Sequence, residues 1–313
     1  MKKHICALAK KMTPGVRRTL SAALCFLLSI IFLFTGRYYH NTGKEFLRGL
    51  TIQSEEREFS MQWLQSMLKE TTGTAEPEIS EREQTTFAAW TEQKEQAILD
   101  KTGGRQSTSD VIAIYGSSRC LLPMGKNLTP ADDKGCIIGR ELAKELFGTV
   151  SAEGRNILWQ DREWIVRAVV SEPSRVLLVE AADRVQNLHF NRISMLLNAS
   201  ADKQTAGESF LLQNSLSARI LRWDYLYETS WIKELIPGEW SDFEGWKSNI
   251  EQYHKTLHLV NDAEKSVIES TGLNYQKKGR WLAIAGVMAF ITSFFLANPP
   301  DPLLRKKNKE FGK

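Results

Sequence analysis

The sequence is most informative, at first, in what it lacks. Only 4 of its 313 residues are cysteine, and they form neither a Cys-x-x-Cys pair nor a Cys/His zinc spacing. No Gly-x-x-x-x-Gly-Lys-Ser/Thr loop occurs, so the chain carries no P-loop for ATP, and no Gly-x-Ser-x-Gly nucleophile elbow is present. Basic patches with interleaved aromatics are also missing, which argues against nucleic-acid binding. The hydrophobic share of 42% excludes a disordered chain.

Charge is absent from two apolar stretches near the ends, 19–36 and 281–298. Eighteen helical residues extend about 27 Å, close to the roughly 30 Å hydrocarbon core of a bilayer. We therefore expect two transmembrane helices. A cleaved signal peptide is the alternative for the first stretch, because a basic segment before an apolar core is also its signature. No small-x-small cleavage site follows, so we expect an uncleaved chain.

The flanks of these stretches predict the orientation. The tail 1–18 holds six basic residues and no acid, and the tail 299–313 holds five basic residues against two acids. Under the positive-inside bias both tails are cytoplasmic and the segment 37–280 is extracytoplasmic, in the cell membrane. Lys277, Lys278 and Arg280 run against this bias. The net charge of +4 comes from the tails, which indicates anionic membrane lipid as a partner and not nucleic acid.

Two of the cysteines, Cys120 and Cys136, fall in the extracytoplasmic segment. A disulfide between them could close the loop 121–135, since such bonds form in oxidising compartments. Two separate buried thiols are the alternative, and the sequence leaves both open. We expect the two residues to be close in space in either case.

The middle segment has an α+β pattern. Three- and four-residue apolar steps predict a helix over 44–70, and a second, charged helix is expected over 81–100. The head, about 105–236, is expected to hold a helix over 141–147, a helical region over 208–236, and strands at 111–115, 136–138, 156–159, 164–170, 175–180 and 192–197. Its sheet core is predicted around Ile112, Ile138, Ile157 and Val166.

A regular apolar seam precedes the second apolar stretch and predicts a helix over 243–271. The seam consists of Trp246, Ile250, Tyr253, Leu257, Val260 and Val267. We expect this helix and the helix 44–70 to form an antiparallel stalk, with Leu47 and Leu50 near Val267 and Ile268. An Asp at Tyr253 or Leu257 should then uncouple head from membrane. Simple burial of the seam against the head is the alternative.

One stretch resembles a known family. The run Gly135-Cys-Ile-Ile-Gly-Arg-Glu-Leu-Ala-Lys-Glu-Leu-Phe-Gly148, followed by Gly154, Ile157 and the strand from Trp164 to Val169, is similar to the extracytoplasmic core domain of MacB/FtsX-type ABC transporter permeases. The likeness covers about 135–172, and its residues indicate a fold and not a catalytic site. Its structural positions are Cys136, Leu142, Ala143, Leu146, Phe147, Gly148 and Gly154; Gly148 is suited to a left-handed helix stop.

The resemblance implies a transport role, with departures. Permeases of this family normally have four spans, and here only two are expected, without a nucleotide-binding domain. We therefore expect a non-catalytic membrane subunit that works with a separate ABC ATPase and with a permease that has the full set of spans. The subunit could also form an oligomer. Its outer domain would dock or couple mechanically during transport or export. The alternative is a membrane-anchored sensor or scaffold that binds a ligand or an envelope partner.

An enzymatic function is not expected. Glu251, His254 and His258 share a helical face and could seat a metal, but an isolated pair of histidines four residues apart is a weak signal. We expect no cofactor and no metal.

Overall fold

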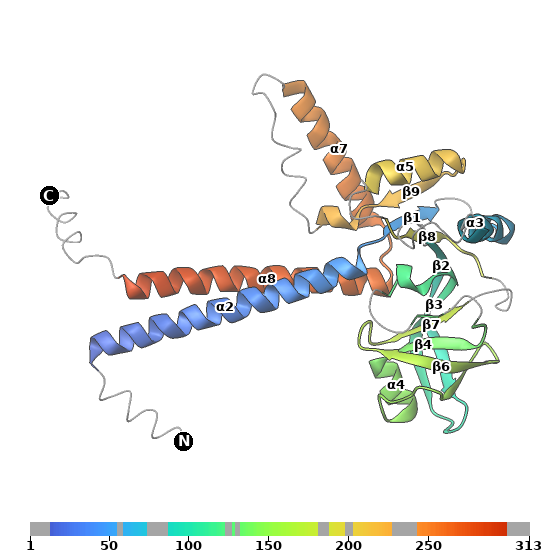
Figure 1. Cartoon of the computed structure of the whole chain (residues 1–313), viewed down its shortest axis with the longest axis horizontal. Helices are drawn as coiled ribbons and strands as arrows, with labels where there is room; N and C mark the ends of the chain where they lie inside the picture. The colour runs from blue at the N-terminus through green and yellow to red at the C-terminus, as the bar shows by residue number, and fades with distance from the viewer. Residues whose placement is uncertain are drawn as a thin grey trace. The chain divides into compact units, whose positions relative to one another are not determined.

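The computed structural model describes residues 13–54, 59–73, 87–122, 127–128, 132–180, 188–197, 203–226 and 243–298. The chain divides into two compact units. A helical unit comprises the residues up to Gly43 and from Asn274 onward, and a larger α+β unit comprises Lys44–Leu273. The cartoon of the whole chain is coloured by residue number in Figure 1.

The helical unit consists of most of α2 (Pro14–Phe46) and most of α8 (Val267–Ala297), which contain the two predicted spans. These helices, of 33 and 31 residues, are long and apolar enough to cross a membrane. They are antiparallel, because contacts pair rising residue numbers on α2 with falling numbers on α8. Ser293 Oγ donates to the Ala22 carbonyl at 2.8 Å, and Gln276 Nε2 donates to the His40 carbonyl at 2.7 Å.

Small residues allow the two helix backbones to approach closely. A Cβ placed on Gly279 would lie 2.9 Å from the carbonyl oxygen of Gly36 and 2.9 Å from the backbone nitrogen of His40. Glycine is therefore required at this crossing, as in many helix pairs within membranes.

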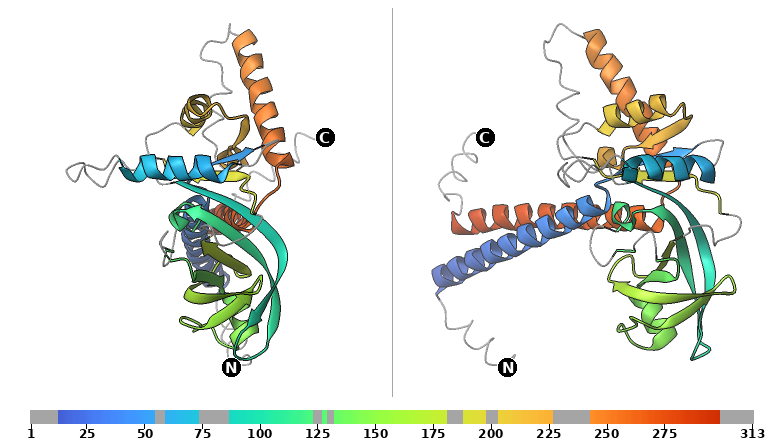
Figure 2. Two further views of the ribbon diagram at one scale, coloured as in Figure 1. Left: turned by 90° about the vertical axis from the view of Figure 1, so that its right-hand side faces the viewer. Right: turned by 45° about the vertical axis from the view of Figure 1, so that its right-hand side comes forward.

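The α+β unit is built on a nine-stranded sheet within its described residues, in the order β3-β7-β4-β6-β5-β2-β8-β1-β9. Because β2 also pairs with β3, the first six strands form a closed ring, and β8, β1 and β9 continue beyond β2. Figure 2 shows β2 and β3 as two long curved strands. The strands are β1 (Leu50–Ser54), β2 (Phe87–Asp100), β3 (Gln106–Gly116), β4 (Gly135–Gly139), β5 (Asn156–Trp159), β6 (Arg162–Val170), β7 (Val176–Glu180), β8 (Arg192–Met195) and β9 (Ala218–Leu221).

Alternation along the strands divides the core into two clusters. On β3, Val111 and Ala113 belong to one cluster and Ile112 and Ile114 to the other. The first cluster also receives Leu142, Ala143 and Leu146 from α4 (Arg140–Phe147). The second is covered by Leu121 and Leu122, just after the short helix η1 (Ser118–Cys120), and by Ile268 of α8. The predicted core residues Ile112, Ile138, Ile157 and Val166 are all fully buried.

The stretch that carries the family resemblance folds as its local signals predict. The helix over 141–147 is confirmed as α4, and it ends at Gly148, whose φ of 71° is left-handed. The hairpin is confirmed as β5 and β6, joined by Gln160 and Asp161 at φ 50° and 58°, the conformation that suits a two-residue hairpin. Cys136 is buried in the first cluster, Phe147 packs against that cluster, and Gly154 has a φ of 80°.

The prediction of a helix over 44–70 is wrong. The chain leaves α2 at Phe46, forms β1, and only then enters α3 (Met61–Gly73). Leu50 and Ile52 are buried in the first cluster, and β1 pairs with both β8 and β9. Tertiary pairing therefore overrides the local helical pattern of this segment.

The helix expected over 81–100 is also wrong, since 87–100 is the long strand β2; residues 81–86 lie outside the described residues. Its first four residues are buried between β3 and β8, where backbone pairing on both sides dominates. The charged middle of the strand lies beyond β8, and the register shifts there between Gln93 and Gln96.

The helical region expected over 208–236 is only partly present. Helix α5 (Lys203–Gln213) ends early, and it is followed by β9 and the short helix η2 (Trp223–Leu226). Ser215, at φ 50°, turns the chain between α5 and β9. Residues 227–236 lie outside the described residues.

The prediction of one continuous stalk helix over 243–271 is wrong. Residues 243–271 form α7 (Phe243–Asp262) and, after a break, the beginning of α8. Leu47 packs in a third cluster with Val260 and Ala263, whereas Leu50 and Ile268 lie in different clusters. The antiparallel pairing expected for the stalk is instead made by α2 with α8.

The possible disulfide is not formed. Neither Cys120 nor Cys136 is in a disulfide, and they pack in the second and the first core cluster, respectively. Burial raises the pKa of the Cys120 thiol to about 12 and also raises the pKa of Cys136. Both groups are therefore protonated apolar contacts at neutral pH.

Candidate functional site

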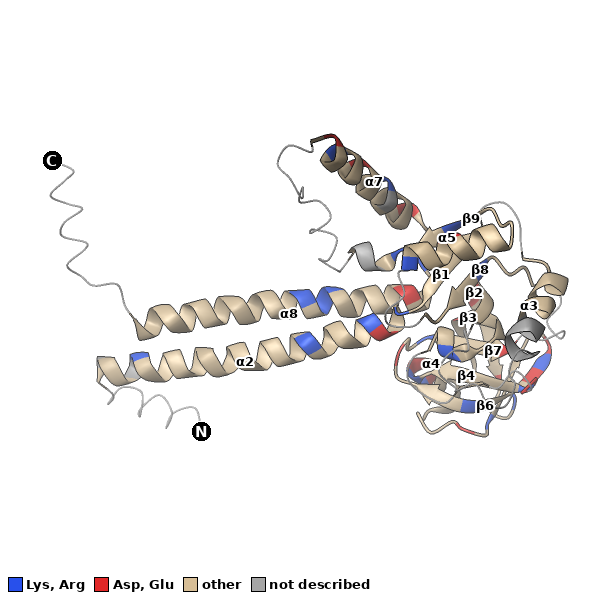
Figure 3. Ribbon diagram, turned by 45° about the horizontal axis from the view of Figure 1, so that its top comes forward, with Lys and Arg blue, Asp and Glu red and all other residues tan. Residues whose placement is uncertain are grey.

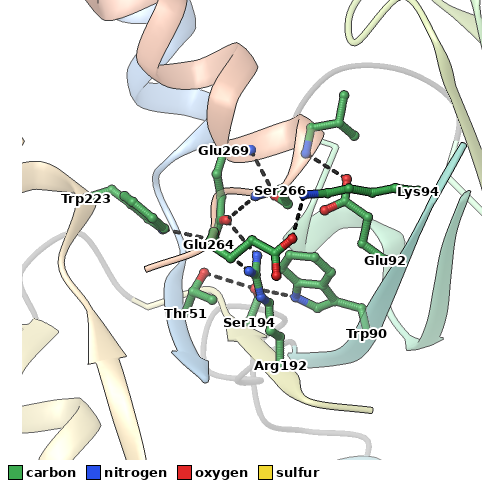
Figure 4. A network of polar contacts seen from close by, with 11 residues as sticks. Thr51, Trp90, Glu92, Lys94, Arg192, Ser194, Trp223, Glu264, Ser266 and Glu269 are labelled. Carbon is green, nitrogen blue, oxygen red and sulfur yellow. Dashed lines mark hydrogen bonds and ion pairs between the residues drawn. The ribbon is translucent and has the colours of Figure 1, made fainter. Parts of the chain in front are cut away.

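A buried polar network lies where α8 begins, against the strands β2, β8 and β1 (Figure 4). Strand β8 lies between the other two, with Arg192 opposite Trp90 and Ser194 opposite Thr51. Ile193 points into the first core cluster, so the alternation of the strand turns Arg192 and Ser194 to the other face. That face is the one that meets the first turn of α8.

The centre of the network is an ion pair between Arg192 and Glu269. Arg192 Nη1 lies 2.7 Å from Glu269 Oε2, and the two side chains are 5% and 6% exposed. The guanidinium also stacks over the Trp90 ring at 4.9 Å and donates through Nη2 to the Glu264 carbonyl. Because both charges are removed from water, loss of either partner should cost about 3–5 kcal/mol, the penalty for an unpaired buried charge.

Glu269 also completes the start of the helix. Ser266 N donates to Glu269 Oε2 at 2.9 Å, and Glu269 N donates to Ser266 Oγ at 3.1 Å. This reciprocal pair is a capping box, which satisfies backbone N–H groups that the first helical turn leaves unpaired. Trp223 Nε1 donates to the remaining oxygen, Oε1, at 2.9 Å. Glu269 thus bonds to β8, η2 and its own helix at once.

Strand β2 supplies a second carboxylate to the same helix start. Val267 N donates to Glu92 Oε1 at 2.8 Å. Burial raises the pKa of Glu92, and the bond from Val267 opposes that rise. A negative charge near a helix N-terminus is favoured by the helix dipole.

The border of the network is polar and more exposed. Lys94 Nζ lies 2.5 Å from Glu264 Oε1, and this hydrogen bond lowers the pKa of Glu264 and raises that of Lys94. Because both side chains are at least half exposed, the pair contributes at most about 1 kcal/mol. Deeper in, Trp90 Nε1 donates to Ser194 Oγ at 2.9 Å, and Ser194 and Thr51 share a bond of 3.1 Å.

The arrangement holds structure together and offers no reacting pair. Every central carboxylate and guanidinium bonds to protein groups, which suits a rigid joint between the sheet and α8. Sequence reasoning did not single out Arg192 or Glu269. The available signal was the Ser-x-x-Glu spacing at 266–269, which marks a helix start inside the seam that was expected to be continuous.

The other weighed residues do not join this network. Glu251, His254 and His258 are exposed on α7. Within the part of the chain that the structure describes, no group of three or more His, Cys, Asp or Glu side chains could hold a metal ion.

Comparison with known proteins gives likeness in fold only. No protein-family model and no curated protein matches the chain. The periplasmic region of MacB from Actinobacillus actinomycetemcomitans is similar at 14% identity and a TM-score of 0.44, over 59% of this chain and 92% of that one. The extracellular domain of the ABC-type transporter YknZ from Gram-positive bacteria is similar at 13% identity and a TM-score of 0.39, over 56% of this chain and 98% of that one. Neither likeness assigns an activity to this chain.

Proposed function

We propose that this chain is a non-catalytic, membrane-anchored subunit of an ABC-type transport machine. Helices α2 and α8 span the cell membrane with both termini in the cytoplasm, and the α+β unit is the extracytoplasmic domain. That domain docks on, or moves with, a permease that is driven by a separate ATPase.

Two sequence observations support this proposal. The segment 135–172 resembles the core domain of MacB/FtsX-type permeases, and its strand, helix and hairpin fold where the resemblance places them. The basic tails and the two apolar helices favour a membrane protein whose middle segment is outside.

The observation that carries the proposal is the Arg192–Glu269 joint. Glu269 lies in the first turn of α8, and α8 runs without a break to Ala297 through the second apolar stretch. The buried ion pair and the capping box fix the first turn of α8 on β8, and we infer that a force on the sheet is passed to this helix. Mechanical coupling requires such a joint, whereas a simple tether does not.

The test is cross-linked co-purification of the full-length chain from native membranes, followed by mass spectrometry. An unrelated two-span protein, with the same tag and level of expression, is the control. We expect enrichment of an ABC ATPase and of a permease with more spans. Enrichment of other envelope proteins without any ABC component would contradict the proposal and favour the sensor or scaffold alternative.

A second variant separates docking from coupling. Arg192→Met with Glu269→Met replaces the buried ion pair by apolar side chains, an exchange that is often close to neutral for stability. We expect this chain to fold and still co-purify, but to lose transport activity in a strain that depends on it. Full activity of the double variant would show that the joint does not transmit force.

A further inference from the structure

The helical unit carries four cationic side chains where both helices leave their apolar stretches. Gly36 and Gly279 meet at the helix crossing, and the residues beside them bring basic side chains to one level. Arg37 follows Gly36 on α2, and Arg280 follows Gly279 on α8. We call this set the collar: Arg37, Lys277, Lys278 and Arg280, with the aromatic residues Tyr38, Tyr39, Tyr275 and Trp281.

The collar cations are exposed and lack acidic neighbours on their own helices. Arg37, Lys277, Lys278 and Arg280 all face solvent. Helix α2 has no Asp or Glu before Glu45, and α8 has none after Glu269. Figure 3 shows blue Lys and Arg segments on α2 and α8, separated from one another by long tan stretches. The collar is therefore a concentration of positive charge on stretches of helix that contain no acidic residue.

The aromatic residues of the collar place it at the membrane surface. Tyr38 is 65% exposed and Trp281 is 64% exposed, although both are large rings. Tyr39 and Tyr275 bridge the two helices with ring centroids 5.5 Å apart, and Lys278 lies 5.8 Å from the Tyr275 ring. Exposed Tyr and Trp at the end of an apolar span are typical of the headgroup level of a bilayer.

Along each helix, the collar borders the end of the apolar stretch that is farther in sequence from the basic tail. The positive-inside bias favours cations at the cytoplasmic end of a span, so it does not explain cations at the other end. Side chains of Lys and Arg at the headgroup level can instead donate hydrogen bonds to phosphate, and they are attracted to anionic lipid. Anionic headgroups are therefore a ligand that fits this exposed concentration of positive charge.

We propose that the collar binds the phosphate groups of anionic phospholipids in the extracytoplasmic leaflet. The proposal rests on the membrane placement of α2 and α8 given under the proposed function. Bound headgroups neutralise the collar, and its exposed rings pack beside the glycerol and upper acyl regions.

The test compares two variants with equal loss of charge. The collar variant is Arg37→Gln/Lys277→Gln/Lys278→Gln, and the control is Lys144→Gln/Lys247→Gln/Lys255→Gln, at exposed lysines on α4 and α7. Each full-length chain is reconstituted in nanodiscs of phosphatidylcholine and phosphatidylglycerol, and retained lipids are counted by native mass spectrometry. Both variants keep the basic tails, so a difference between them reports the collar.

We expect the wild type and the control to retain phosphatidylglycerol preferentially. The collar variant should lose this preference by about tenfold or more, because each Lys or Arg beside an anionic surface changes binding by roughly fivefold. An unchanged preference in a membrane-integrated collar variant overturns the collar alone. Release of the wild-type chain from vesicles by alkaline carbonate overturns the membrane placement, and with it the collar.

Discussion

Arg192 and Glu269 form a buried ion pair, 2.7 Å between Nη1 and Oε2, between residues 77 positions apart in the chain. One residue lies on the strand β8, between β2 and β1, and the other lies in the first turn of the helix that continues into the second apolar stretch. The helix is interrupted between the end of α7 at Asp262 and the start of α8 at Val267, and this ion pair fixes the start of α8 against β8.

The substitution Arg192→Met should destabilise the α+β unit strongly. It leaves Glu269 buried with one fewer donor and removes the stacking over Trp90, for an expected loss of about 3–5 kcal/mol in the free energy of unfolding. Urea unfolding of the full-length chain in detergent, followed by tryptophan fluorescence, measures it. The control is Lys94→Met at the exposed pair with Glu264, where the loss should stay below about 1 kcal/mol. Equal losses would contradict the burial argument.

The capping box makes a separate prediction about the start of α8. Ser266→Ala removes the oxygen that accepts from Glu269 N and should cost about 0.5–2 kcal/mol, whereas Ser266→Asp keeps an acceptor and should cost much less. Hydrogen exchange at residues 266–270 should accelerate in the alanine variant alone. Faster exchange in both variants would show that the hydroxyl does not act as a cap.

A buried acid away from the network predicts a pH dependence. Glu180 is 2% exposed, its Oε2 has no hydrogen-bond partner, and burial raises its pKa to about 8. The folded chain thus holds this proton more tightly than the unfolded chain, whose value is near 4.5. The stability this provides is fully present below about pH 4.5 and is lost as pH rises through about 8.

We therefore expect the unfolding free energy to fall between pH 5 and pH 9, by roughly 3–5 kcal/mol from this group. Glu180→Gln keeps the shape without the charge and should flatten that part of the profile. Parallel urea titrations of the two chains across this range provide the measurement. An identical slope in both chains would assign the pH dependence to other groups.

The close approach of α2 and α8 predicts that the size of the side chain at position 279, and not its polarity, limits how closely the two helices pack. A side chain there would meet backbone atoms of α2 at 2.9 Å, so Gly279→Leu should force the helices apart. A disulfide between Tyr39→Cys and Tyr275→Cys, at the site where the two rings now touch, reports the pairing. We expect efficient oxidation in the wild-type background and in a Val287→Leu control, and little in the Gly279→Leu background. Retained oxidation would show that the crossing tolerates separation.

The sequence predicts the parts of the fold whose signals are local. Helix α4 has buried Leu142 and Leu146 one turn apart and Gly148 at its end, and the β5–β6 hairpin has a two-residue turn; each needs only neighbouring residues. Strand β2 could not be predicted in this way, because its charged middle has no strand-like alternation and its pairing partners lie on β3, β5 and β8.

The site was hidden from sequence analysis for a related reason. Arg192 lies in a four-residue strand whose side chains are all buried, and a charge there indicates a partner without saying which one. In the helix that the apolar seam predicts, Glu269 is an ordinary polar position. Only the packing of α8 on β8 brings them together, across 77 residues of chain.

The most direct test of the joint is a double-mutant cycle on Arg192 and Glu269 in the full-length chain, with Arg192→Met, Glu269→Met and the double variant unfolded in urea. The buried pair predicts that the double variant is more stable than either single variant, with a coupling free energy above about 2 kcal/mol. Losses that simply add, with a coupling near zero, would contradict the claim that this pair fixes the first turn of α8 on β8.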